Sequence, residues 1–185
     1  RRQRQIGIRD RPGRSIDEVI AKYNPAKVVK LASNENPLGP SPKAKEVLTL
    51  SVDALHLYPD GDAKELKEKI AKLEAVSTKQ IVIGNGSNEI LELAARAFLN
   101  NNSSALMSKH AFAVYKIIAQ VCGSKIIEVP MIDWRHDLEN FKNYITGDTR
   151  IVFIANPNNP TGSYLTKIEI RELMERIAKN IVVVI

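Results

Sequence analysis

The sequence has little cysteine and little histidine. Among its 185 residues there is one cysteine, Cys122, which cannot form a disulfide within the chain. The three histidines, His56, His110 and His136, are scattered without the spacing of zinc ligands. The sequence therefore predicts neither a disulfide framework nor a metal site.

Long apolar runs are also missing. A helix that crosses a bilayer needs about 20 apolar residues, and no apolar run in the sequence approaches this length. The first ten residues also lack the apolar core of a signal peptide. Hydrophobic residues make up 44% of the chain and charged residues 26%, as in an ordinary soluble globular protein. We expect a cytoplasmic protein with no membrane partner.

Aromatic residues are scarce at 5%, which bears on nucleic-acid binding because the net charge is +6. The positive excess falls largely in the first fourteen residues, at Arg1, Arg2, Arg4, Arg9, Arg11 and Arg14. This segment has no interleaved aromatic residues on which bases could stack. We expect a basic arm that is solvated or contacts another subunit rather than nucleic acid. Nucleic-acid binding through the arm remains an alternative, and it predicts an affinity that falls steeply with salt.

Prolines divide the chain near its beginning. The segment "NENPLGPSP" carries Pro37, Pro40 and Pro42 around Gly39, so it is predicted to be neither a helix nor an inner strand. It separates residues 1–40, the arm and a proline-rich loop, from a domain over 41–185. A helix is predicted to start at Pro42, and a second helix is predicted to be capped by Asp62.

Short apolar strands then alternate with helices. Strands are predicted at 80–84, 104–108, 125–129, 150–156 and 181–185, and helices at 87–99, 112–123, 136–145 and 167–180. Such alternation is typical of an α/β fold with a mostly parallel sheet and helices on its faces, which makes three layers.

Two loops of this sheet are candidates for chemistry. The first is "IGNGSNE" at 83–89, where Gly84 and Gly86 allow a tight turn and Ser87 is expected to cap the helix. The free N–H groups of the first helical turn suit a phosphate. An ordinary glycine-rich turn is the alternative, since the lysine of a P-loop is lacking.

The second loop is "IANPNNPTG" at 154–162, directly after an apolar strand. Pro157 and Pro160 fix the backbone on either side of Asn158 and Asn159. A side-chain amide in this loop is able to donate to a phenolate or carbonyl oxygen without changing its protonation. The alternative is that the amides satisfy the backbone of the loop itself.

The motifs "LASNENPLGPSPKA", "LYPDG", "GNGSNEILELAARAF" and "NPNNPTG", in this order, resemble the N-terminal half of the histidinol-phosphate aminotransferase family. The resemblance runs from about Pro12 onward. It implies a pyridoxal-phosphate (PLP) enzyme with the aspartate-aminotransferase fold. It also implies a homodimer that transfers an amino group between glutamate and a phosphorylated imidazole compound, with histidinol phosphate and 2-oxoglutarate as substrates in histidine biosynthesis. Residues 41–185 would be the first part of the large domain, with the rest and the small domain missing.

The resemblance also assigns residues to the cofactor. The backbone of Gly86, Ser87 and Asn88 would hold the PLP phosphate, although many relatives carry an aspartate in place of Asn88. Phe112 would stack on the pyridine ring, with plain helix core as the alternative. Asn159 would hydrogen-bond the phenolic oxygen of the cofactor.

Three further residues are assigned in the same way. Tyr58 would reach the phosphate in the neighbouring subunit, or would merely complete a turn beside Pro59. Asn34 and Asn36 would lie near the substrate, or would cap their own loop.

The resemblance places no catalytic residue in this chain. The family's aspartate usually follows the strand that "IVVVI" resembles, and its Schiff-base lysine comes later. None of the candidate lysines lies in that motif: Lys109, Lys116, Lys125, Lys142, Lys167 and Lys179. We expect a fragment that is inactive alone. The alternatives are an aromatic-amino-acid aminotransferase, a phosphothreonine decarboxylase, or a non-catalytic domain that binds a phosphorylated ligand.

Overall fold

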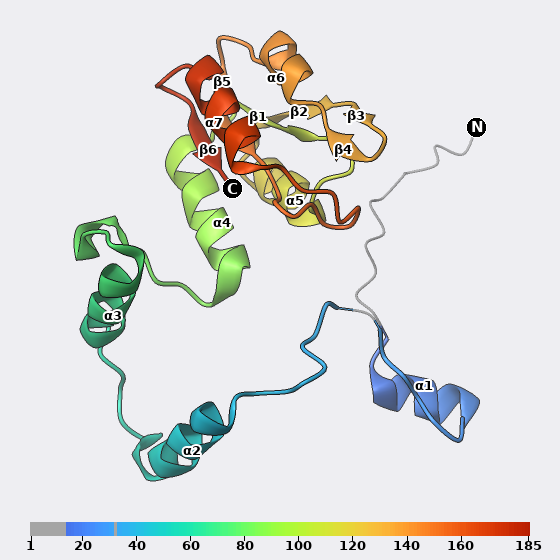
Figure 1. The fold of residues 1–185 in the computed structure, drawn as a ribbon, viewed down its shortest axis with the longest axis vertical. Coiled ribbons are helices and arrows are strands. Elements are labelled where there is room, and N and C mark those ends of the chain that lie inside the picture. The colour runs from blue at the N-terminus through green and yellow to red at the C-terminus, as the bar shows by residue number, and fades with distance from the viewer. Residues whose placement is uncertain (1–13, 32) are drawn as a thin grey trace. The chain divides into compact units, whose positions relative to one another are not determined.

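A computed structural model describes residues 14–31 and 33–185, which form two compact units, one ending at Lys69 and one running from Ile70 to Ile185 (Figure 1). The predicted basic arm covers the first fourteen residues. All of them except Arg14 lie outside the described residues. No helix in the described part of the chain is long and apolar enough to cross a membrane.

The first unit consists of helices and turns. Helix α1 (Ile16–Tyr23) is capped by Ser15, whose Oγ accepts a hydrogen bond from the Glu18 N–H at 3.1 Å. Helix α2 (Pro42–Ser51) begins at proline, as predicted, and continues into the 3₁₀ helix η1 (Val52–Ala54).

Helix α3 (Lys64–Glu74) begins in the first unit, but its start differs from the prediction. The Asp60 carboxylate accepts from the N–H groups of Asp62 at 3.0 Å and Lys64 at 2.8 Å. The prediction that Asp62 caps this helix is therefore wrong. Asp60 takes over because its side chain folds over the turn that precedes the helix.

The second unit has the predicted alternation of strands and helices. Its elements are η2 (Thr78–Gln80), α4 (Gly86–Phe98), β1 (Ser104–Ser108), α5 (Ala113–Val121), β2 (Lys125–Val129), β3 (Met131–Ile132), β4 (Arg135–His136), α6 (Leu138–Tyr144), β5 (Thr149–Phe153), α7 (Lys167–Arg176) and β6 (Val182–Val184). The strand predicted at 80–84 is wrong. Gln80 ends η2, and residues 81–84 join no ladder of the sheet.

Four of these strands make one parallel sheet in the order β2-β1-β5-β6, and β3 and β4 form a separate antiparallel hairpin. In β1, Leu106 pairs with Ile127 of β2 on one side and with Val152 of β5 on the other. The chain therefore leaves β1 toward one side of the sheet and leaves β5 toward the other. The gap between β1 and β5 is a topological switch point.

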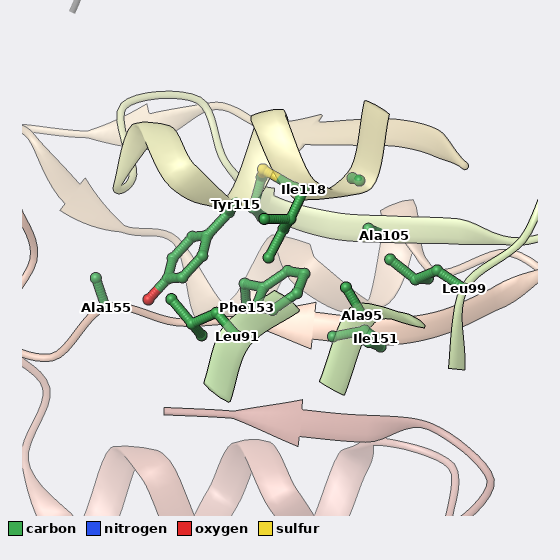
Figure 2. Packing of buried hydrophobic residues seen from close by; sticks show 11 residues of the cluster. Leu91, Ala95, Leu99, Ala105, Tyr115, Ile118, Ile151, Phe153 and Ala155 are labelled. Carbon is green, nitrogen blue, oxygen red and sulfur yellow. The ribbon is translucent and has the colours of Figure 1, made fainter. Parts of the chain in front are cut away.

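Both faces of the sheet are covered, which confirms the three-layer α/β prediction. On one face, α4 and α5 pack against side chains that alternate along the central strands: Ala105, Met107, Ile151 and Phe153 (Figure 2). On the opposite face, residues of α6 and α7 pack against Leu106, Val152 and Ile154. These central strands read as continuous apolar runs because both of their faces are buried.

An aromatic stack closes the first face near the carboxyl end of β5. The Tyr115 ring lies parallel to that of Phe153, with centroids 4.7 Å apart and an interplanar angle of 13°. The Phe112 ring meets Tyr115 edge-on at 5.6 Å. The three rings, from the buried Phe153 through Tyr115 to the half-buried Phe112, connect the core to the loop after β1.

Candidate functional site

The candidate site lies at the carboxyl ends of β1 and β5, where the switch point opens a crevice in sheets of this type. Helix α4 begins at the same edge, because its last turn leads within a few residues into the start of β1. Figure 2 agrees with this direction: Leu91 lies toward Phe153 and Ala155, whereas Leu99 lies toward Ala105. The start of α4 and the carboxyl ends of β1 and β5 thus lie at one edge of the second unit.

The start of α4 is shaped by glycine. Gly86 has φ +79° and its N–H donates to the Gly84 carbonyl at 3.0 Å. The helix cap is Asn85, so the prediction that Ser87 caps the helix is wrong. The chain turns into the helix before Ser87, which lies inside the first turn. The Glu89 carboxylate reaches back to accept from the Asn85 N–H.

The first turn of α4 keeps donors for a ligand. Within the described chain the Asn85 side chain makes no capping hydrogen bond, and Ser87 and Asn88 are exposed. The unpaired N–H groups at a helix start, together with the positive end of the helix dipole, attract an anion. This turn is therefore suited to hold a phosphate through backbone donors.

Phe112 is the N-cap residue of α5 and is half-buried. One side of its ring packs against the core through Tyr115, so the helix-core alternative holds for part of the side chain. The residue as a whole keeps part of its surface exposed. A ring with this support is pre-ordered for stacking, since its orientation is already fixed by packing.

Two of the three asparagines in the loop after β5 form hydrogen bonds within the loop. The Asn156 amide pairs with Leu165 in both directions: Nδ2 donates to the carbonyl at 3.2 Å, and Oδ1 accepts from the N–H at 2.7 Å. Asn158 is buried, and its backbone pairs with Ser163 and Gly162 at 2.7 Å each. Asn159 is exposed, and its side chain has no hydrogen bond to the described residues. It is the asparagine that this loop leaves for a ligand.

Asn158 also ties this loop to the loop after β1. Its Nδ2 donates to the His110 carbonyl at 3.0 Å and to Thr161 Oγ1 at 2.8 Å. Its Oδ1 is buried without a partner among the described residues. The amide therefore joins the segment that carries Phe112 to the segment that carries Asn159.

A second tie runs through His136, which is 6% exposed. Its Nδ1 lies 2.7 Å from Ser108 Oγ and its Nε2 lies 2.9 Å from the Ala155 carbonyl oxygen. Burial lowers the pKa of the imidazole, and the charge of Arg135 acts in the same direction, against a hydrogen bond to Ala155 that raises the pKa. A neutral ring is favoured, because protonation would place an extra charge among buried groups.

Tyr58, Asn34 and Asn36 belong to the first unit. The side chain of Tyr58 is fully exposed. Asn36 caps its own loop: its Oδ1 accepts from the Leu38 N–H at 3.0 Å and its Nδ2 donates to the Gly39 carbonyl at 3.2 Å. Asn34 is exposed and has φ +51°. Their roles toward cofactor and substrate stay predictions.

Together the second-unit residues offer an anion site at a helix start, a supported aromatic ring and a neutral amide donor. Residues 26–185 match the family described as aminotransferase class I and II. The chain belongs to this family. Its histidinol-phosphate aminotransferase relatives include one from Geobacillus sp. (strain WCH70), 43% identical over 174 residues, and one from Pseudomonas aeruginosa, 46% identical over 176 residues.

The match covers 94% of this chain and 48% of each of these two relatives. The chain therefore spans about half the length of the curated aminotransferases it matches. Among solved structures, a putative histidinol-phosphate aminotransferase from Erwinia carotovora atroseptica has a TM-score of 0.76 at 29% identity, covering 82% of this chain and 44% of that chain.

A second solved structure shares the fold. It is the histidinol-phosphate aminotransferase from Sinorhizobium meliloti in complex with pyridoxal-5'-phosphate, with a TM-score of 0.78 at 22% identity, covering 82% of this chain and 41% of that chain. The parallel sheet found here is therefore that of the PLP-dependent aminotransferase fold, as the resemblance implied.

Sequence reasoning gave no role to two residues that hold the candidate site together. His136 entered as a histidine without zinc spacing and as the first residue of the helix predicted at 136–145, whereas it lies in β4 and α6 begins at Leu138. Asn158 entered only as one of the loop amides between Pro157 and Pro160. The pattern "NPNNP" did signal more amides than one ligand needs. Nothing local links His136 to Ser108, because the two meet only through the path of the chain between β1 and β4.

Gly86 gives a direct test of the geometry at the start of α4. Gly86→Ala is expected to lower the free energy of unfolding by about 1 to 2 kcal/mol, because a Cβ is disfavoured at positive φ. A Cβ at Gly86 would meet nothing within 4 Å, so the cost is conformational. Gly147→Ala is the control, since Gly147 has an open surrounding and a φ outside the left-handed region. Equal denaturation midpoints for the two variants would contradict this geometry.

Proposed function

We propose that this chain is the cofactor-binding part of a PLP-dependent aminotransferase that moves an amino group between histidinol phosphate and 2-oxoglutarate. The observation that carries the proposal is the meeting of the α4 start, Phe112 and Asn159 at one edge of the sheet. The choice of substrate is supported by the names of the relatives at 43% and 46% identity. We place the enzyme in the cytoplasm, as its composition suggests.

The residues present fit PLP group by group. The Gly86, Ser87 and Asn88 segment supplies backbone donors for the phosphate dianion, and the helix dipole favours that charge. Phe112 offers a supported ring face for the pyridine. The Asn159 amide is free to donate to the phenolic oxygen. In this proposal residues 41–185 form the first part of the large domain, and residues 1–40 carry the arm and the substrate loop with Asn34 and Asn36.

The chain contributes binding and orientation to the reaction. When bound, PLP supplies an electron sink for charge that develops on the substrate carbon. Phe112 would fix the plane of the ring and keep water from one of its faces. Asn159 would hold the phenolic oxygen with a donor whose charge does not change with pH. The backbone of the α4 start would anchor the phosphate, so that the ring is held from both ends.

Cofactor binding is the first test of this assignment, on the full-length protein freed of cofactor and titrated with PLP. Asn159→Ala should raise the Kd about 10-fold or more, because a hydrogen bond to a charged oxygen is lost. Asn180→Ala serves as the control, since Asn180 is exposed just before β6, at the opposite edge of the sheet. A full-length protein that does not bind PLP would refute the proposal.

Substrate choice is tested by turnover. We expect the full-length enzyme to have a higher kcat/KM for histidinol phosphate than for phenylalanine or phosphothreonine. Preference for phenylalanine would indicate an aromatic-amino-acid aminotransferase, and carbon dioxide release from phosphothreonine would indicate a decarboxylase. Binding of phosphate in the absence of PLP, with no turnover of any of these three compounds, would indicate a non-catalytic domain.

A homodimer is part of the proposal. The first unit exposes large apolar side chains on α2 and the segment after it, with Leu50 and Leu55 each 77% exposed. Clustered apolar exposure of this kind marks interaction surfaces. Tyr58, at 101% exposure, follows directly in the chain. A partner subunit would cover these residues and receive the Tyr58 hydroxyl at its phosphate site.

Mixed dimers test the placement of Tyr58. If Tyr58 serves the partner's site, a dimer of one Tyr58→Phe and one Asn159→Ala subunit contains one site with both defects and one intact site. Re-equilibrated mixtures should then be more active than the average of the two variants, because each mixed dimer has one intact site. Activity equal to the average of the two variants would show that Tyr58 acts in its own subunit or not at all. Sedimentation of the full-length protein should give the mass of a dimer.

A further inference from the structure

His136 contacts both central strands at their carboxyl ends. It comes from the short β3–β4 hairpin, which belongs to neither strand nor to the candidate site. Its ring lies between Ser108, the last residue of β1, and Ala155, just beyond β5. All three residues are buried. The ring therefore bridges the switch point.

The hydrogen-bond partners define the tautomer of the ring. A carbonyl oxygen only accepts, so Nε2 must carry the proton and donate to Ala155 at 2.9 Å. In the neutral ring Nδ1 is then bare and accepts from the Ser108 hydroxyl at 2.7 Å. Both ring nitrogens are satisfied in this neutral form, which burial of the ring favours.

The two anchors lie at equal distances in sequence from the proposed cofactor contacts. Phe112 lies four residues after Ser108, and Asn159 lies four residues after Ala155. A displacement of the carboxyl end of β1 would therefore also displace Phe112, and a displacement of the carboxyl end of β5 would also displace Asn159. The Asn158 bridge to the His110 carbonyl spans the same gap farther along both loops.

The hairpin itself is held from outside. The Arg135 guanidinium donates to both Glu169 carboxylate oxygens, at 2.7 and 2.9 Å, and to the Tyr164 carbonyl. The Ser163 hydroxyl donates to the Trp134 carbonyl at 2.9 Å. The backbone that carries His136 is thus fixed to α7 and to the far side of the Asn159 loop.

We infer that His136 is a positioning residue for the proposed cofactor site, which sets the spacing between Phe112 and Asn159 by joining Ser108 to Ala155. The inference rests on the proposed function. It deepens that function by naming a residue that would act on the cofactor only through the two loops. Loss of the bridge should change the free energy of PLP binding more than it changes the free energy of unfolding.

The test compares two buried serines of the same strand in the full-length protein. Ser108→Ala removes the hydroxyl at the carboxyl end of β1 and leaves the His136 ring in place. Ser104→Ala removes a hydroxyl at the amino end, where Ser104 Oγ lies 3.1 Å from Thr149 Oγ1. His136→Leu removes the whole bridge, and Ser108→Ala remains informative if that variant does not fold.

Ser108→Ala and His136→Leu are expected to raise the Kd for PLP about 5-fold, the size of one hydrogen bond. Ser104→Ala is expected to lower the denaturation midpoint and leave the Kd unchanged. In ¹⁵N spectra of the wild type, the His136 ring should show a protonated Nε2 and a bare Nδ1. The amide signals of Phe112 and Asn159 should move in Ser108→Ala and stay in place in Ser104→Ala.

An unchanged Kd in both bridge variants, or an equal rise in Ser104→Ala, would overturn the inference. A wild-type protein that fails to bind PLP would instead refute the proposed function. The amide signals would still decide the positioning role in that case: movement of Phe112 and Asn159 in Ser108→Ala alone supports it, and no movement refutes it.

Discussion

The pairing of β1 with β5 is the constraint on which the rest of the second unit depends. These strands are neighbours in the sheet although β2 and the hairpin lie between them in the chain. Because both strands run in the same direction, their carboxyl ends come to one edge, and the chain departs from them to opposite sides. Burial of both faces fixes the register, since a slip by one residue would exchange the side chains that face α4 and α5 with those that face α6 and α7.

The sequence predicted the layered fold because that information is local. Four of the five predicted strands and the helices between them formed, because apolar runs and caps are properties of short stretches of sequence; in the structure Thr166 and Glu169 form such a capping box at the start of α7. The strand at 80–84 failed because an apolar run becomes a strand only when a neighbour pairs with it. The caps at Asp62 and Ser87 failed by a shift of two residues each, because several polar residues at a helix start are able to serve and packing of the turn selects one.

The candidate site was predictable only in part for the same reason. Gly86 and Asn159 lie in compact motifs, and the sequence predicted Gly86 at the start of a helix and Asn159 in the loop after an apolar strand, where the structure has them. The contacts that bring these loops together are long-range: Asn158 reaches the His110 carbonyl, and His136 reaches Ser108. No periodicity or spacing encodes them, because they depend on the strand order of the finished sheet. Positioning residues are therefore harder to find in a sequence than the residues that they position.

The two ends of the sheet use polar groups in different ways. At the amino end, Asp148 binds the Thr146 hydroxyl and pairs with Lys125, which lowers its pKa to about 2 and keeps it charged. At the carboxyl end, the groups that join the end of β1 to the end of β5 are an amide, a hydroxyl and an imidazole whose pKa is lowered by burial, and the charged Arg135–Glu169 pair lies outside them on the hairpin and α7. A charged bridge there would compete with the helix start for an anion or attract it to the wrong place. Neutral bridges fix the geometry and leave the N–H groups of α4 as the source of positive potential. A buried histidine whose pKa is lowered by burial suits this end of the sheet, because it joins Ser108 to Ala155 without adding a charge.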